Sequence, residues 1–258
     1  MSGTTGMVNI FFAHCNLQCI YCQNGTISGR NVEPALVRFD DCEAIADEVC
    51  RLLPQSSGLV GFVTAAHYSY AIPAIADAIA RRGCRPIYVY NSSGYESVEA
   101  LQRLEGLIDI YLPDLKYMDS RLAEAYSHAA DYPEVATRAL LEMKRQVGGG
   151  LKVDGDIAYR GMIVRHLVLP GAVGNTLQCL DWLADNFTPY NLHLSLMAQY
   201  FPPSEGLPTP LNRRVEADEY AAAAEHYNKL GFAGWLQEMS SQQCYRPDFS
   251  NPDIPFAE

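Results

Sequence analysis

The chain has 258 residues, which suits one large domain or two small ones, and its 48% hydrophobic content supports a sizeable core and argues against disorder. The formal net charge of −11 lacks the basic excess typical of proteins that bind nucleic acid or acidic membranes, so neither partner is expected. No apolar run reaches the ~20 residues of a membrane span, and no signal-like segment opens the chain. These features predict a cytoplasmic protein.

Apolar, strand-like segments alternate with helical patterns along the chain. In chain order we predict a strand at 7–13, a helix at 40–53, a strand at 59–64, a helix at 70–82, a strand at 86–90, a helix at 97–104 and a strand at 107–112. There follow a helix at 133–147, a hairpin over 151–169 with a long second arm, a helix at 176–186, a strand at 191–197 and a helix at 216–230.

Strand–helix alternation with continuous apolar strands indicates an α/β fold, with a parallel sheet covered by helices. About six such units fit, too few for the eight of a closed barrel. We therefore expect a partial (β/α)6 TIM-like barrel of parallel strands with outer helices, with a flat, doubly wound sheet as the alternative. It would form one domain over 1–236, followed by a surface tail over 237–258. In either fold, ligands bind at the carboxyl ends of the strands.

Three of the eight cysteines form a Cys-x3-Cys-x2-Cys loop directly after the first predicted strand, at Cys15, Cys19 and Cys22. Thiolates select zinc, copper(I) or iron–sulfur, and a structural zinc site needs four ligands, but this chain has no second Cys-x2-Cys pair. Three thiolates on a 4Fe–4S cluster leave one iron open for a cofactor. A zinc site and three metal-free thiols are the alternatives. We expect the other cysteines that can be placed to be small core residues: Cys42, Cys50, Cys84 and Cys179. Cys244 in the tail stays unassigned.

With Tyr21 before its last cysteine, the loop resembles that of the radical S-adenosylmethionine (radical SAM) superfamily. Three further blocks, YNSSGY (90–95), YLPDLKYMD (111–119) and VRHLVLPG (164–171), resemble pyruvate formate-lyase activating enzymes and, more closely, their uncharacterised iron–sulfur relatives. The resemblance implies a radical SAM core and an oxidoreductase that cleaves S-adenosylmethionine reductively to a 5′-deoxyadenosyl radical. It also implies a flavodoxin or ferredoxin as electron donor.

The resemblance places Asp114 and Lys116 at the cofactor, where Lys116 would pair with its carboxylate; a surface ion pair is the alternative. Asn91 and Ser92 would lie near the ribose, although Ser92 or Ser93 could instead cap a helix. The family has Asp where this chain has Asn91, which weakens the case for a monovalent cation near Asn91 and Asp114.

Arg165 is expected either to clamp the ligand or to pair with a core acid. Leu167 would contact the adenine. Met197, Gln199 and Tyr200 match the adenine-facing end of the last strand, or are plain core. The second strand ends in Thr64-Ala65-Ala66-His67 where the family has Gly-Gly-Glu, so the backbone at Thr64 would bind the cofactor ammonium. His67 faces substrate or is a satisfied structural histidine.

The substrate class follows from resemblance alone. The leading hypothesis is hydrogen abstraction from a glycine of a partner, which would be a glycyl radical protein. The alternatives are radical SAM chemistry on a small molecule and a non-enzymatic metal-binding protein.

Overall fold

The computed structural model describes residues 2–37, 39, 41–242 and 249. Within these residues, one sheet has the strand order β1–β2–β3–β4–β6–β7–β8, and all neighbours in it run parallel. The strands are β1 (Val8–Phe11), β2 (Leu59–Val63), β3 (Ile87–Ser92), β4 (Ile110–Pro113), β6 (Ile157–Leu167), β7 (His193–Met197) and β8 (Ala233–Leu236). β5 (Lys152–Asp154) pairs antiparallel with β6 and forms the predicted hairpin.

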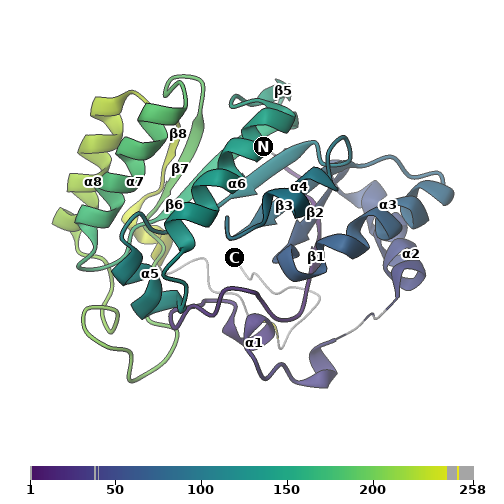
Figure 1. Ribbon diagram of the computed structural model, residues 1–258. Helices are drawn as coiled ribbons and strands as arrows, with labels where there is room; N and C mark the ends of the chain where they lie inside the picture. Colours follow the sequence, from purple (N-terminus) through teal and green to yellow (C-terminus); the bar gives the residue numbers. More distant parts are fainter. Residues whose placement is uncertain (1, 38, 40, 243–248, 250–258) are drawn as a thin grey trace.

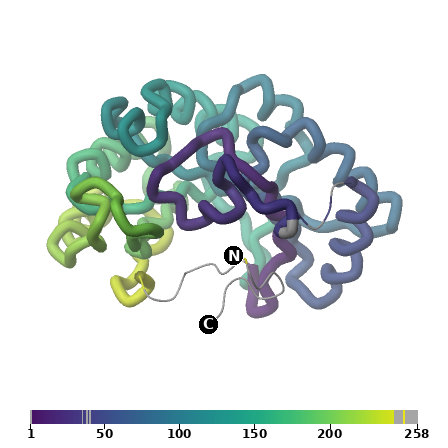
Figure 2. Tube along the Cα trace, turned by 90° about the horizontal axis from the view of Figure 1, so that it is seen from below, coloured from purple at the N-terminus to yellow at the C-terminus, as the bar shows by residue number. Residues whose placement is uncertain are grey.

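The helices from α2 onward cover one side of this curved sheet, whereas α1 belongs to the segment that follows β1 (Figure 1). They are α1 (Gly25–Ser28), α2 (Cys42–Leu52), α3 (Ile72–Arg81), α4 (Val98–Gln102), α5 (Ser120–Ser127), α6 (Tyr132–Val147), α7 (Val173–Asn186) and α8 (Ala217–Leu230). Four short 3-10 helices cover Pro34–Leu36, Leu53–Gln55, Ala66–Ala71 and Met239–Gln242. Figure 2 shows the elements as an open arc, with the segment after β1 lying across its middle.

The strand order follows the chain order, which distinguishes a barrel from a doubly wound sheet. Each crossover moves in the same direction, so the helices collect on the outer face and the order never reverses. β1 and β8 stand at the two ends of the order instead of pairing with each other. The predicted partial parallel barrel is therefore confirmed.

The barrel has one parallel strand more than the six expected. β8 pairs with β7, placing Gly234 beside Leu194. Gly234 has φ +124°, and a Cβ there would lie 2.3 Å from the Leu194 carbonyl oxygen, so only glycine fits. Glycine lowers strand propensity, which is why this short strand gives little signal in the sequence.

The two faces of the sheet belong to different clusters of buried side chains. The larger cluster combines outward-facing strand residues such as Tyr90 and Leu194 with the apolar faces of the helices. The smaller one lies on the opposite face and contains Leu59, Val89, Ile110, Leu112, Ala158 and Ile163. Asn91, Asp114 and Arg165 come two residues after members of that inner cluster and share their face. A polar layer thus lies above an apolar floor, toward the carboxyl ends of the strands.

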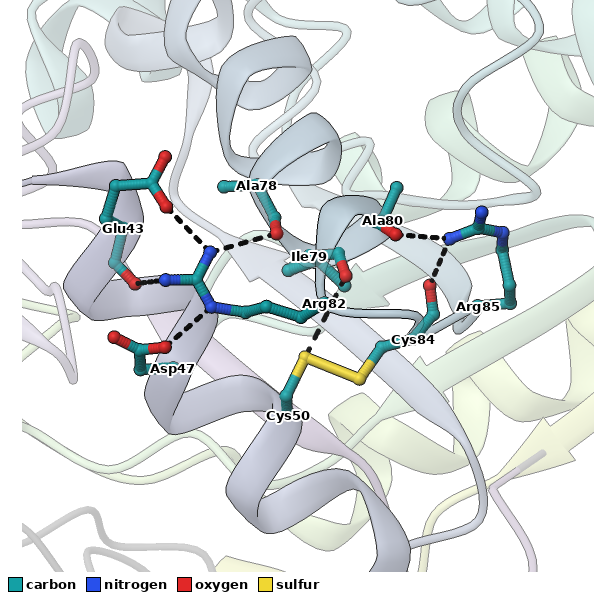
Figure 3. The surroundings of a disulfide bond; sticks show 9 residues. All are labelled: Glu43, Asp47, Cys50, Ala78, Ile79, Ala80, Arg82, Cys84 and Arg85. Atoms are coloured by element: carbon teal, nitrogen blue, oxygen red, sulfur yellow. Dashed lines mark hydrogen bonds and ion pairs between the residues drawn. A yellow bond between two sulfur atoms is a disulfide. The ribbon is translucent and has the colours of Figure 1, made fainter.

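Two of the cysteines expected as separate core residues are instead joined by a disulfide. Cys50 near the end of α2 is bonded to Cys84, which precedes β3, with 6.3 Å between their Cα atoms (Figure 3). Packing of α2 against α3 brings together residues 34 positions apart, which no local pattern could reveal. Cys179 is fully buried as predicted, and Cys42 is half-buried. Cys244 and most of the tail lie outside the described residues.

Candidate functional site

The cysteine loop follows β1 and crosses the carboxyl ends of the strands. Three hydrogen bonds anchor it to separate segments: Asn16 Nδ2 to the Tyr95 carbonyl (2.7 Å), the Ile20 N–H to the Tyr126 carbonyl (2.9 Å) and Gln23 Nε2 to the Gln199 carbonyl (3.1 Å). The carbonyls belong to the turn after β3, to α5 and to the segment after β7. The loop is therefore held in place by three elements of the barrel.

The three loop thiols are largely withdrawn from water. Burial raises the pKa of Cys15, Cys19 and Cys22, that of Cys22 to about 11, and neighbouring thiols of the loop add to the shift of Cys15 and Cys22. The charge of Lys116 acts in the opposite direction on all three and favours their thiolates. Without metal the loop therefore carries neutral thiols, which a bound metal centre would have to deprotonate.

Among the residues that the structure describes, no three His, Cys, Asp or Glu side chains are gathered as they would be around a bound metal ion. The chemistry of the loop nevertheless fits an iron–sulfur cluster. It offers three sulfur ligands close enough to influence one another electrostatically, and a lysine charge beside them. Three ligands from one loop leave a position of such a cluster for a further molecule.

Asp114, Lys116 and Arg165 form a charged group beside the cysteine loop. Lys116 Nζ lies 2.6 Å from Asp114 Oδ2, and Arg165 Nη2 lies 2.7 Å from Asp114 Oδ1. The side chain of Lys116 is 17% exposed, that of Asp114 14% and that of Arg165 25%. The pair of Lys116 and Asp114 is therefore not the surface ion pair that was the alternative. Burial by itself would raise the pKa of Asp114, but the two cations outweigh it and hold that pKa below its usual value.

Arg165 pairs with a core acid and also donates to Asn91 Oδ1 (2.6 Å). The Arg165 guanidinium thus supplies positive charge beside Asn91 and Asp114. This is the place for which the sequence raised the question of a bound monovalent cation. Arg165 Nε is buried and has no hydrogen-bond partner among the described residues. Two cations against one carboxylate leave a surplus positive charge, which together with the open Nε suits an anionic ligand.

Ser92 and Asn91 face opposite sides of β3 because side chains alternate along a strand. Ser92 Oγ donates to Glu96 Oε1 (2.7 Å) and accepts from the Gly94 N–H (2.9 Å), so it shapes the turn behind the sheet. The helix cap is Ser97, which accepts from the Ala100 N–H, rather than Ser92 or Ser93. Asn91 belongs to the inner face, whereas Ser92 supports it from behind.

The end of β2 has an unusual backbone. Thr64 has φ +60°, a conformation that glycine adopts freely and that branched side chains rarely adopt. Thr64 opens the stretch Thr64-Ala65-Ala66-His67, which stands where the resembled family has Gly-Gly-Glu. His67 Nε2 lies 2.7 Å from the Ala13 carbonyl oxygen, which ties the end of β2 to that of β1. His67 Nδ1, however, is buried and has no hydrogen-bond partner among the described residues, so this histidine is not fully satisfied and the contact does not decide between the two interpretations.

The expected adenine contacts divide into two groups. Leu167 and Met197 are register partners at the ends of β6 and β7, both half-buried and on the face of Arg165. Tyr200 is fully buried, donates to the Leu211 carbonyl (2.6 Å) and packs edge-on against Tyr21. The structure thus places Leu167 and Met197 toward the inner face, while Tyr200 is part of the core.

Two buried polar residues that the sequence did not single out position Lys116. Tyr132 Oη in α6 accepts from the Lys116 N–H (2.9 Å) and lies 2.7 Å from the Ser93 carbonyl oxygen, which it can reach as a donor. Asn175 in α7 accepts from the Met118 N–H (2.9 Å) and donates to the Lys116 carbonyl (2.9 Å). Each lies in the first turn of a helix that packs on the sheet. The sequence around them does not mark either residue as part of the site, and only their burial in the structure does.

Solved structures of radical SAM enzymes share this fold. HydG, a maturase of the [FeFe]-hydrogenase, superposes with a TM-score of 0.57 at 12% identity, covering 92% of this chain and 53% of its own. SuiB from Streptococcus suis, bound to S-adenosylmethionine, gives 0.55 at 11% identity, covering 91% and 48%. Methylornithine synthase (PylB) gives 0.51 at 12% identity, covering 88% and 63%. The chain has the fold of the radical SAM enzymes and spans about half to two-thirds of these proteins.

Comparison at the level of sequence adds one relative. The uncharacterized protein MJ0674 of Methanocaldococcus jannaschii is 27% identical over 230 residues, which cover 85% of this chain and 62% of that protein. No family model matches the chain. Among the described residues, no helix is both long and apolar enough to cross a membrane.

Proposed function

We propose that this protein is a radical SAM enzyme in which Cys15, Cys19 and Cys22 hold a 4Fe–4S cluster. One observation carries the proposal: the Cys-x3-Cys-x2-Cys loop lies at the carboxyl ends of a partial parallel barrel, where the charge of Lys116 acts on all three thiols. When bound, the cluster supplies the electron that cleaves S-adenosylmethionine to methionine and a 5′-deoxyadenosyl radical. A flavodoxin or ferredoxin in the cytoplasm would provide that electron.

The residues of the charged group would bind the methionine part of S-adenosylmethionine. Lys116 and the open Nε of Arg165 are suited to its carboxylate, and the backbone of Thr64 to its ammonium. Asn91 would contact the ribose, with Leu167 and Met197 against the adenine. We assign Ser92, Asp114, Tyr21 and Tyr200 to holding these groups in place, because their own polar atoms are already bonded within the protein.

We further propose that the radical removes a hydrogen atom from the α-carbon of a glycine in a partner protein. The support is the joint presence of the YLPDLKYMD and VRHLVLPG blocks, which resemble the activating enzymes of glycyl radical proteins. Asp114, Lys116 and Arg165 of these blocks form the charged group, so the resemblance covers the site itself.

The experiment is anaerobic reconstitution with iron and sulfide. The wild-type protein should turn brown and hold about four irons per chain. Cys15→Ala, Cys19→Ala and Cys22→Ala should each lose the colour and all cleavage of S-adenosylmethionine, whereas Cys42→Ala, at the start of α2, should retain both. Stoichiometric zinc without sulfide in the wild type, or full activity in a loop variant, would refute the proposal.

A further inference from the structure

Three buried hydroxyl groups form a chain that ends on the sulfur of Cys19. Tyr21 Oη lies 2.6 Å from Tyr117 Oη, Tyr117 Oη lies 2.7 Å from Ser127 Oγ, and Ser127 Oγ donates to Cys19 Sγ at 3.0 Å. Tyr21, Tyr117 and Ser127 are 5%, 0% and 2% exposed, so water does not compete for these contacts. The chain joins the cysteine loop, the segment after β4 and the last turn of α5.

The direction of the chain follows from its number of protons. A hydroxyl has one proton to donate, and a sulfur that ligates metal can only accept. Ser127 donates its one proton to Cys19, so in its contact with Tyr117 it can only accept, and Tyr117 must donate. For the same reason Tyr21 must donate to Tyr117. All three O–H dipoles therefore point toward the sulfur, and each bond polarises the next.

The backbone holds Ser127 where this contact requires it. Ser127 is the last residue of α5, and His128 ends the helix in the left-handed conformation, at φ +54°. The preceding carbonyl, that of Tyr126, accepts the N–H of Ile20, the neighbour of Cys19 (2.9 Å). The hydroxyl and the loop are thus aligned by two contacts from consecutive residues of α5.

We infer that Ser127 is a positioning residue that donates a hydrogen bond to the sulfur of Cys19 and thereby raises the reduction potential of the cluster bound there. The inference rests on the proposed function. A reduced cluster carries one more negative charge than an oxidised one, so a donor aimed at a ligating sulfur stabilises the reduced form more. Tyr117 and Tyr21 keep that donor in place and strengthen it.

The test is an anaerobic potentiometric titration of the reconstituted cluster, followed by its paramagnetic resonance signal. Ser127→Ala removes the donor, Ser127→Thr keeps it, and Tyr117→Phe removes only the support behind it. Thr137→Val is the control, because the Thr137 hydroxyl bonds the Pro133 and Glu134 carbonyls of its own helix. At the midpoint of the wild type, Ser127→Ala should show a reduced-to-oxidised ratio about tenfold lower, a shift of about 59 mV for one electron.

The expected pattern is a lower potential in Ser127→Ala, a smaller decrease in Tyr117→Phe, and wild-type values in Ser127→Thr and Thr137→Val. Equal potentials in wild type and Ser127→Ala, at full iron content, would overturn the inference and leave the proposed function intact. A wild type without any cluster would instead refute the proposed function. If Ser127→Ala holds no cluster, Tyr117→Phe decides: a lowered potential supports the inference, and an unchanged one refutes it.

Discussion

At the scale of the single residue, Lys116 is bound to Asp114 on one side and acts on the three cysteine thiols on the other. With the cluster intact, Lys116→Ala should weaken S-adenosylmethionine binding by roughly 1.5–3 kcal/mol, the range for a hydrogen bond to a charged group. Anaerobic calorimetry measures the affinity. Lys229→Ala, an exposed residue of α8, is the control and should bind as the wild type does. Unchanged affinity in Lys116→Ala would assign the carboxylate to Arg165.

Glu96 is a second residue whose chemistry follows from its burial. Burial raises its pKa from 4.5 to about 7, although Ser92 and Tyr90 both donate to it. Between these two pH values the folded protein holds a proton that the unfolded chain releases, so the stability of the fold must fall as pH rises from about 4.5 to 7. The loss is about 3 kcal/mol by the usual conversion of a pKa shift.

Glu96→Gln keeps an acceptor for both hydroxyls and removes the titration. Its free energy of unfolding relative to the wild type should therefore increase by about 2.5 kcal/mol between pH 5 and pH 8. Urea unfolding of the metal-free proteins at both pH values measures this difference. Gln102→Ala at the end of α4, which removes no titrating group, should show no such trend. A difference for Glu96→Gln that does not change with pH would contradict the prediction.

At the scale of the element, the disulfide links α2 to the segment that enters β3. Cys84 lies three residues before β3, at the amino ends of the parallel strands, whereas the cysteine loop lies at their carboxyl ends. Closing a loop of 34 residues restricts the unfolded chain, which corresponds to about 3–4 kcal/mol in the chain-entropy account. A reductant should therefore lower the stability of the metal-free wild type by about that amount and leave Cys84→Ala unaffected. Equal urea midpoints of the wild type with and without reductant would contradict this.

At the scale of the whole molecule, the barrel presents its polar layer beneath the cysteine loop and leaves β1 and β8 unpaired with each other. The substrate proposal belongs to this scale, because it concerns what reaches that layer. Reduced enzyme with S-adenosylmethionine and a glycyl radical protein deuterated at glycine should yield deuterated 5′-deoxyadenosine and a persistent glycyl radical signal. The undeuterated partner is the control. If 5′-deoxyadenosine acquires deuterium only from a labelled small molecule, the substrate is a small molecule rather than a protein.

Much of the fold could be predicted because its signals are local. Apolar strand segments that alternate with helical patterns predicted twelve elements in chain order, with residues that end helices marking their limits. The observed strands and helices overlap all twelve. α5 was not among the predicted helices, although Asp119 caps it by accepting from the Arg121 N–H. β8 was also missed, since its four residues include a glycine that is required by the neighbouring strand rather than by the local sequence.

The sequence by itself determined a loop of three closely spaced cysteines, because the spacing of neighbouring residues is encoded locally. The resemblance of two further blocks pointed to Asp114, Lys116 and Arg165. Only the tertiary structure decided what supports them. Ser127 reaches Cys19 across 108 residues, and Cys50 reaches Cys84 across 34. Asp114 meets Arg165 only because β4 and β6 are neighbours in the barrel. Such partners are set by the packing of distant segments, and no pattern along the chain records which distant side chains that packing brings into contact.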